Sequence, residues 1–326
     1  MKRETGLERI AELIKKSKKI VIFTHVRPDG DALGSAMALK TALDELNISS
    51  TYCSESPMPS NLAFIPGLEC VKQELPNEQA DLYIALDNSD SSRLGVFADE
   101  FLSAWRKKIT TVNIDHHVSN NCYADYNYVR VCSSNCMNVA TLVDLLGVPY
   151  SKKLAEYLLT GLLTDSGNFS HDDVNEECFL LASRLVACGA DIRLLCYELF
   201  KKQPKERVAL HSDVMSKMRY FHSNQFALIT ISLEQMQRYG ADNGMTEGFV
   251  DFPLSVDTVE VAASIMEVKK GQYKISLRSK SYADVNKIAS VYGGGGHVHA
   301  SGCMLYGDLE EIIDKLSYTV SQYLEF

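Results

Sequence analysis

The sequence predicts an α/β protein with two domains: a parallel-sheet domain with helices on both faces, a smaller α/β domain, and an active-site cleft between them. In the N-terminal half, short apolar runs alternate with helical segments, which is typical of parallel strands buried on both faces. A charged helical stretch near residue 200 separates this half from a second strand-and-helix unit. The length of 326 residues is enough for a core in each unit.

The first unit is predicted over residues 1–190. Residues 1–19 alternate charged and apolar positions, which indicates an amphipathic first helix rather than a signal peptide. The strands are expected at 19–25, 50–55, 81–87 and 109–115, and the helices at 31–46, 97–107, 136–147, 152–164 and 175–190. Gly189 is a plausible stop for the last of these helices.

A helical linker is expected at 191–220 and a second domain at 221–326. Within the second domain we predict a strand at 225–232, a hairpin over 259–279, a helix at 283–292 and a closing helix at 308–326. The segment 243–256 admits two interpretations: a substrate-facing loop, or a packing or dimer contact through Phe249 and Phe252.

The composition excludes some functions. Hydrophobic residues make up 46% and charged residues 23% of the chain, as in globular proteins, and no apolar run approaches the ~18 residues of a membrane-spanning helix. A net charge of −9 argues against binding long nucleic acid, whose affinity depends on neutralising phosphates. The nine cysteines are scattered without a CxxC pair, which predicts reduced thiols and a cytoplasmic location.

Acidic and imidazole side chains follow three of the predicted strands. They are His25, Asp29 and Asp31 after the first strand, Asp87 at the end of the third, and Asp115, His116 and His117 at the end of the fourth; Asp165 lies just past a helix end. Because ligands bind beyond the carboxyl ends of parallel strands, these groups should converge on one rim. Carboxylate and imidazole ligands suit Mn²⁺ or Mg²⁺. The alternative, solvated loop residues, requires three independent strand ends to carry such groups by chance.

A glycine-rich stretch, GGGGHVHASG, occupies residues 293–302. Successive glycines allow backbone N–H groups to approach an anion, so the stretch is expected to contact a phosphate or nucleotide. The alternative is a flexible linker, although a linker does not usually run from an apolar helix into such a sequence. Arg278 and Ser279, at a strand end, have the groups needed to hold a phosphate.

In this order the motifs resemble the DHH–DHHA1 family of phosphoesterases over nearly the whole chain. THVRPDGDALGS, ALDNSD, IDHH and LLTDSGNF resemble the four motifs of the first domain, and SLRSK with GGGGHVHASG resembles the DHHA1 end. The arrangement is most similar to the bacterial nanoRNase and pAp phosphatase group and to the stand-alone cyclic-di-AMP or pApA phosphodiesterases. Family II inorganic pyrophosphatases share the first four motifs but have a different second domain. Ser301 stands where members often have alanine.

The resemblance implies a role for each of these residues. His25, Asp29 and Asp87 would bind one Mn²⁺, and Asp31, Asp87, His116 and Asp165 a second, with Asp87 bridging. His117 would donate a hydrogen bond to the scissile phosphate and Asp115 would orient an imidazole. The substrate would be bound by Arg278, Ser279, Gly294, Gly295, Gly296 and His297.

The implied function is a Mn²⁺-dependent phosphodiesterase that hydrolyses very short oligoribonucleotides such as pApA to 5′-nucleoside monophosphates. Two metal ions would hold a water molecule for in-line attack on phosphorus. Cyclic-di-AMP or pAp are alternative substrates. A pyrophosphatase and a non-catalytic nucleotide sensor are further alternatives, and homodimerisation is an expectation from relatives.

Overall fold

The computed structural model describes residues 3–325 and divides into two compact units, one ending at Lys202 and one beginning at Gln203. The predicted fold class is confirmed: each unit contains a sheet and packed helices. The residues expected as a linker divide between the units. α7 (Ile192–Cys196) packs on the first core through Leu195, whereas α8 (Lys205–Met215) contributes Leu210 and Val214 to a core of the second.

The first unit contains a six-stranded sheet in which all neighbouring strands are parallel. Its spatial order is β1 (Arg3–Glu4), β6 (Tyr126–Val129), β5 (Thr110–Asp115), β4 (Leu82–Leu86), β2 (Lys19–Phe23) and β3 (Ser49–Cys53). The chain therefore runs from β2 to β3 on one side and continues from β4 on the other side of β2. In open parallel sheets this reversal of strand order marks the ligand-binding crevice.

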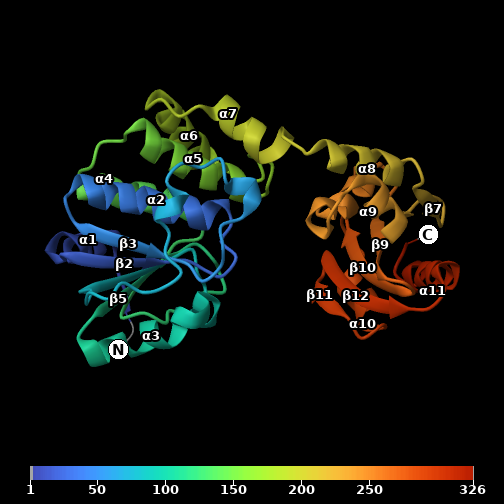
Figure 1. The fold of residues 1–326 in the computed structure, drawn as a ribbon, viewed down its shortest axis with the longest axis horizontal. Coiled ribbons are helices and arrows are strands. Elements are labelled where there is room, and N and C mark those ends of the chain that lie inside the picture. The colour runs from blue at the N-terminus through green and yellow to red at the C-terminus, as the bar shows by residue number, and fades with distance from the viewer. Residues whose placement is uncertain (1–2, 326) are drawn as a thin grey trace. The chain divides into compact units, whose positions relative to one another are not determined.

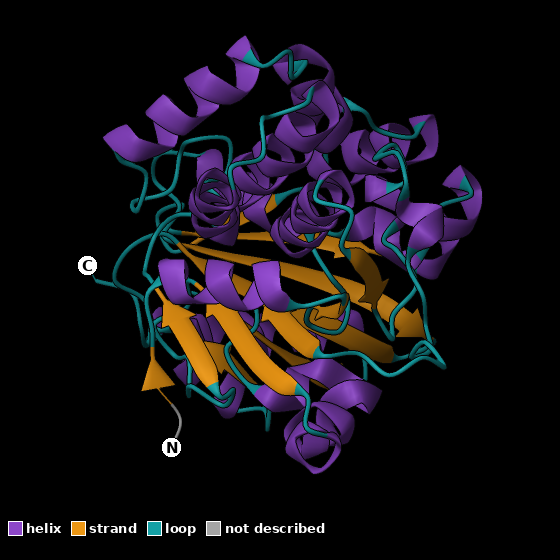
Figure 2. Ribbon diagram, turned by 90° about the vertical axis from the view of Figure 1, so that its left-hand side faces the viewer, coloured by secondary structure: helices purple, strands orange, loops and turns teal. Residues whose placement is uncertain are grey.

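Helices cover both faces of this sheet (Figures 1 and 2). The larger core lies under α1 (Leu7–Lys16), α2 (Gly30–Glu45), α4 (Asn135–Leu146) and α5 (Lys152–Asp165), with α6 (Glu176–Ala187) packed against α5. The opposite face packs against α3 (Ala98–Ser103) and its flanking turns through Phe97 and Phe101. Two covered faces explain why β4 is apolar throughout.

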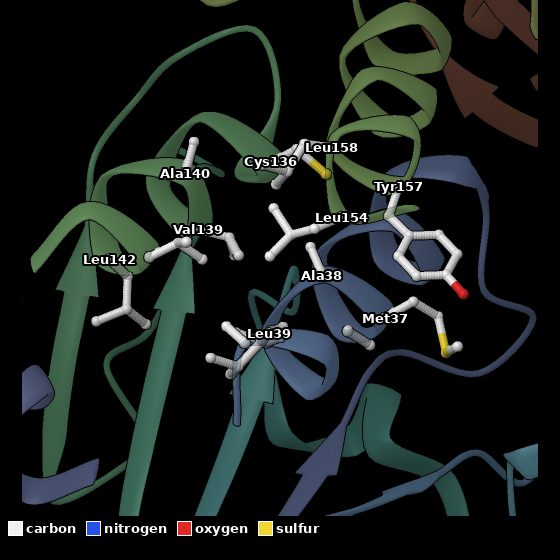
Figure 3. Packing of buried hydrophobic residues seen from close by; sticks show 14 of the residues in the cluster. Met37, Ala38, Leu39, Cys136, Val139, Ala140, Leu142, Leu154, Tyr157 and Leu158 are labelled. Atoms are coloured by element: carbon white, nitrogen blue, oxygen red, sulfur yellow. The ribbon is translucent and has the colours of Figure 1, made fainter. Parts of the chain in front are cut away.

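α2, α4 and α5 meet in the interior shown in Figure 3, where Leu39, Val139 and Leu158 are buried. Close approach of α2 and α5 depends on two glycines. A Cβ on Gly34 would lie 2.5 Å from the Tyr157 carbonyl oxygen, and a Cβ on Gly161 would lie 2.6 Å from Asp31 Oδ1. The absence of side chains at these positions brings the ends of α2 and α5 together.

Two strands of the first sheet were not anticipated from the sequence. β1 is only two residues long, and β6 is half exposed apart from the buried Asn127, so neither has the continuous apolar run that identifies the other strands. Asp165 also differs slightly from expectation, because it is the last residue of α5 rather than a residue past the helix.

The second unit contains a mixed six-stranded sheet in which β8 and β9 are parallel and the other pairs antiparallel. The order is β11 (Gly295–His297), β12 (Ala300–Tyr306), β10 (Gln272–Ser279), β9 (Val261–Lys269), β8 (Phe226–Ile231) and β7 (Arg219–Phe221). The core on one face includes α10 (Val285–Ser290) and α11 (Leu309–Ser321). α9 (Leu233–Tyr239) and α8 pack against the opposite face of the sheet (Figure 1).

The predicted hairpin of β9 and β10 is confirmed. The glycine-rich stretch is itself a hairpin, β11 and β12, rather than an open loop. A Cβ on Gly294 would lie 2.5 Å from Cys303 Cβ, and one on Gly296 would lie 2.5 Å from the Ala300 carbonyl oxygen. Close strand packing therefore explains these two glycines without a phosphate. Within residues 3–325, no helix has both the length and the apolar composition needed to cross a membrane.

Candidate metal centre

The side chains that follow β2, β4 and β5 converge at the carboxyl edge of the first sheet. Three groups of potential ligand atoms lie within 4.8 Å of one another: His25, Asp29 and Asp87; Asp87, His116 and His117; and Asp31, His116 and Asp165. Asp87 belongs to two of these groups, and His116 also belongs to two. The spacing expected from the strand ends is therefore present in the structure, although the role of each residue in metal binding stays a prediction.

Asp87 is at the centre of the cluster. It follows β4 directly, is 2% exposed and has a φ of 53°, in the left-handed region that a short polar side chain tolerates better than most. Its Oδ2 lies 3.6 Å from His25 Nε2 and its Oδ1 lies 3.3 Å from His116 Nε2. One carboxylate thus faces an imidazole on each side, an arrangement suited to bridging two cations.

The tautomers of both imidazoles follow from their second nitrogen. His25 Nδ1 lies 3.0 Å from the Val26 carbonyl oxygen and His116 Nδ1 lies 2.7 Å from that of Cys132. Because a carbonyl can only accept, each Nδ1 carries a proton and each Nε2 is directed at carboxylates. This is the arrangement by which proteins orient a metal-binding histidine.

The two aspartates of the PDGD turn are held differently. Asp29 caps α2, accepting from the backbone N–H groups of Asp31 and Ala32 through Oδ1, while its Oδ2 lies 3.6 Å from His25 Nε2. Asp31 lies in the first turn of α2, and its fully buried side chain contacts the N-terminus of α4. It accepts hydrogen bonds from Ser134 Oγ (2.7 Å) and from the backbone N–H groups of Asn135 (2.5 Å) and Cys136 (3.0 Å). The N-terminal donors of a helix thus stabilise this buried charge.

In the DHH motif, the side chains of Asp115 and His117 contact each other. Asp115 is fully buried, its Oδ1 lies 2.8 Å from His117 Nδ1, and its Oδ2 accepts from Asn120 Nδ2 at 2.6 Å. His117 is 34% exposed. The structure thus places Asp115 in contact with an imidazole; the orienting role of Asp115 and a substrate contact of His117 stay predictions.

The cluster shifts the pKa values of its members strongly. Burial alone would lower the pKa of His25, but the nearby carboxylates of Asp29 and Asp87 raise it to about 10. Burial likewise opposes protonation of His116, yet Asp87 and the charge of Asp31 raise its pKa to about 10. Burial and then neighbouring negative charges raise the pKa of Asp31 to about 6 and that of Asp165 to about 10. Against burial, the two histidines hold the pKa of Asp87 below its ordinary value.

The donor set fits a divalent cation. Asp87 Oδ1 and His116 Nε2 are buried atoms with no hydrogen-bond partner among the described residues, although they lie 3.3 Å apart. Leaving a buried polar atom unsatisfied costs about 1–3 kcal/mol. A hard or borderline cation such as Mn²⁺ or Mg²⁺ would satisfy both atoms and offset the crowded carboxylates.

We expect the metal-free protein to lose stability as the pH rises from 7 to 10. A histidine whose pKa is raised by folding contributes stability that is complete below its unfolded pKa of ~6.5 and is lost as the pH passes through the folded value. Asp165 acts in the same direction, because ionising it is less favourable in the folded state than in the unfolded chain.

A bound cation would replace these protons, so the stabilisation by Mn²⁺ should be larger at pH 8.5 than at pH 6.5. Stabilisation is about 2.7 kcal/mol when the ligand concentration is 100 times Kd, and Kd should fall with rising pH. Thermal unfolding with and without a fixed Mn²⁺ concentration at both pH values measures this difference. An equal shift at the two pH values would contradict proton displacement.

The predicted substrate residues of the second unit lie on different faces of its sheet. Arg278 is 34% exposed and forms an ion pair with Asp251, Nε to Oδ1, at 3.0 Å. Ser279, the next residue, is 7% exposed and its hydroxyl lies 2.8 Å from His299 Nδ1. Gly295, Gly296 and His297 are exposed in the edge hairpin. Substrate contacts of these residues and of Gly294 stay predictions.

Sequence reasoning missed several polar residues around these sites. Ser134 and Asn120 contact the buried aspartates, and Ser276 shares the face of β10 that carries Arg278. Ser134 has a recognisable signal, because it precedes an apolar helical run as an N-cap residue does. The others depend on contacts between distant segments and have no local signature.

Comparison with known proteins agrees with this geometry. The family model for the DHH family, N-terminal domain, matches residues 19–162 and that for the DHHA1 domain matches residues 225–324. A curated relative from Thermus thermophilus, named bifunctional oligoribonuclease and PAP phosphatase NrnA, is 31% identical over 97% of this chain and 93% of its own length. A probable protein of the same name from Streptococcus mutans is 27% identical over 96% and 98%.

Among solved structures, an exopolyphosphatase-related protein from Bacteroides fragilis matches with a TM-score of 0.85 and 27% identity, covering 97% of this chain and 96% of that chain. The similarity therefore extends through both units. The predicted family is confirmed: the chain belongs to the DHH family and is a phosphoesterase that carries a C-terminal DHHA1 domain.

Proposed function

We propose that the protein is a Mn²⁺-dependent phosphodiesterase that hydrolyses very short oligoribonucleotides, such as pApA, to 5′-nucleoside monophosphates. The observation that carries the proposal is the convergence of the two buried, unsatisfied atoms Asp87 Oδ1 and His116 Nε2 within three overlapping ligand groups. The full-length relatives named oligoribonuclease and PAP phosphatase support the substrate class.

His25, Asp29, Asp31, Asp87, His116 and Asp165 would hold two divalent ions, with Asp87 shared. Bound ions would supply Lewis-acid stabilisation of phosphoryl charge and a more acidic water molecule as nucleophile. His117, whose Nδ1–H donates to Asp115, would in its doubly protonated form also donate from Nε2 to a phosphoryl oxygen. Arg278 and the exposed part of the glycine-rich hairpin would contact the terminal phosphate.

A second candidate activity is removal of the 3′-phosphate of pAp, supported by the bifunctional names of the relatives. A cyclic dinucleotide remains a third substrate candidate. The free cysteines support a reducing compartment such as the cytoplasm, and a homodimer remains a proposal taken from the resemblance.

The test is a substrate panel of pApA, longer RNA, cyclic-di-AMP, pAp and pyrophosphate, each incubated with Mn²⁺ and again with chelator. We expect release of AMP from pApA with Mn²⁺, little turnover of longer RNA and none with chelator. Release of phosphate from pyrophosphate without turnover of any nucleotide would overturn the proposal.

A further inference from the structure

The face of the second sheet opposite α10 and α11 carries a polar row, which is partly exposed along β10. Along β10, Ile275 and Leu277 point into the core beneath α10 and α11, so the alternating residues Lys274, Ser276 and Arg278 face the other side. On neighbouring β9, Ser264 and Met266 pair with Ser276 and Lys274 on this face. The row thus places two cations four residues apart on one strand.

A segment that connects α9 with β9 borders this face and forms a pocket with it. The pocket has a volume of ≈480 Å³. It is lined by Thr246, Glu247 and Val250 of the segment and by Ser264, Ser276 and Arg278 of the strands. Lys274 also lines it, so cationic side chains outnumber acidic ones. A pocket of this size and composition can accept a phosphorylated nucleoside.

Two side chains of α8 contact this segment and hold it in place. Arg207 donates to the carbonyl oxygens of Met245 and Glu247, and its guanidinium lies 4.8 Å from the centre of the Phe249 ring. His211 makes edge contacts with Phe249 and Phe252, with ring centres 4.9 and 5.0 Å away. Phe249 is almost fully buried. Phe249 and Phe252, which flank Asp251 in the chain, thus both contact His211, and Asp251 lies beside β10.

Asp251 in turn fixes Arg278. Its Oδ1 lies 3.0 Å from Arg278 Nε, while Arg278 Nη1 donates to the Leu277 carbonyl oxygen at 3.1 Å. No partner of Arg278 Nη2 is found among the described residues. A half-exposed ion pair contributes little to the stability of the fold. The main effect of this ion pair is therefore to set the direction of the guanidinium.

We propose that Asp251 is a positioning residue that orients Arg278 toward the pocket, where Arg278 binds the terminal phosphate of a short oligonucleotide. This inference rests on the proposed function. It explains why an acidic residue borders a phosphate-binding pocket, where unpaired negative charge would repel the ligand. Asp251 engages Nε and the Leu277 carbonyl oxygen accepts from Nη1, so the N–H groups of Nη2 stay available to phosphate oxygens.

The test compares Asp251→Ala and Asp251→Asn with the matched control Asp257→Ala in the full-length protein. Asp257 is exposed in the same connection, and its side chain contacts the Thr258 backbone N–H. The substrates are pApA and ApA, which share the scissile bond but differ in the terminal phosphate. The Arg278→Ala variant and the Asp251→Ala/Arg278→Ala double variant complete a cycle.

We expect Asp251→Ala to raise KM for pApA about tenfold with kcat nearly unchanged, because a misdirected guanidinium loses a charge-assisted hydrogen bond. KM for ApA should not change, Asp251→Asn should fall between wild type and Asp251→Ala, and the double variant should match Arg278→Ala. Equal effects on pApA and ApA, additive effects of the two substitutions, or a lower KM in Asp251→Ala would overturn the inference. The last outcome would mean that Asp251 competes with the phosphate.

Binding of AMP and adenosine separates this inference from the proposed function. If wild type hydrolyses neither dinucleotide, the proposed function fails, and calorimetry still tests Asp251. AMP should then bind wild type more tightly than adenosine, and Asp251→Ala should remove most of that difference. An unchanged preference for AMP in Asp251→Ala would overturn the positioning role.

Discussion

Replacing Asp87 by asparagine is expected to reduce Mn²⁺-dependent hydrolysis of pApA by at least about 100-fold. This reduction is larger than that expected for replacing a residue that only hydrogen-bonds to a metal ligand. The carboxylate faces both His25 and His116, so the substitution removes the one charge that both histidines share. Asparagine tolerates the left-handed φ of 53°. Without the Asp87 charge, His25 and His116 can each release one proton and become neutral. No unpaired buried charge then remains on them, so the domain should stay folded.

Turnover of pApA and calorimetric titration with Mn²⁺ measure this effect, and Asp87→Ala should behave in the same way. The matched control is Asp90→Asn, three residues along the same loop. Asp90 caps the following 3-10 helix by accepting from the Ser92 N–H at 2.8 Å, and it belongs to none of the ligand groups. Unchanged turnover in Asp87→Asn would eliminate Asp87 as a shared ligand.

The substitution Gly161→Ala is expected to weaken Mn²⁺ binding about tenfold or more, although Gly161 is not itself a predicted ligand. Its Cβ would lie 2.6 Å from Asp31 Oδ1 and 3.0 Å from Asp31 Cα, and would also overlap Cys136 Sγ. Relief requires α5 to move away from α2, which separates Asp165 from Asp31. Overpacking of this kind costs about 1–3 kcal/mol of folding stability.

The matched control for Gly161→Ala is Gly147→Ala. Gly147 ends α4 with a φ of 78°, and a Cβ added there would have open space, with no packed neighbour within 4 Å among the described residues. Alanine there costs about 1 kcal/mol of backbone strain at the end of α4 opposite to Asp31. Denaturant unfolding should show both variants destabilised, whereas calorimetry should show weaker Mn²⁺ binding only for Gly161→Ala. Equal Mn²⁺ affinity in the two variants would contradict this explanation.

Much of the candidate metal centre could be predicted because its residues lie directly beyond strands. An apolar run such as residues 20–23 identifies a buried strand, and the polar residues that follow must then lie at its carboxyl end. The same reasoning was less informative for Arg278 and Ser279. Adjacent residues of a strand point to opposite faces, and only the structure shows that Arg278 faces the pocket while Ser279 contacts His299.

The glycine-rich stretch shows a second limit. Its composition is compatible with a phosphate-binding loop and with a tightly packed hairpin, because both need a backbone without side chains. The contacts of Gly294 with Cys303 and of Gly296 with Ala300 decide that the segment is a hairpin. Those contacts come from strand pairing, which composition does not specify.

The sequence by itself determined the chemistry: which strands end in carboxylates and imidazoles, and hence which class of ion they could bind. Only the tertiary structure decided the geometry. Placing β2 beside β4 brings His25 to 3.6 Å from Asp87, and packing α4 against α2 supplies the donors for Asp31. The physical reason is that strand order and helix packing result from contacts between residues far apart in the chain, whereas sequence patterns report local burial.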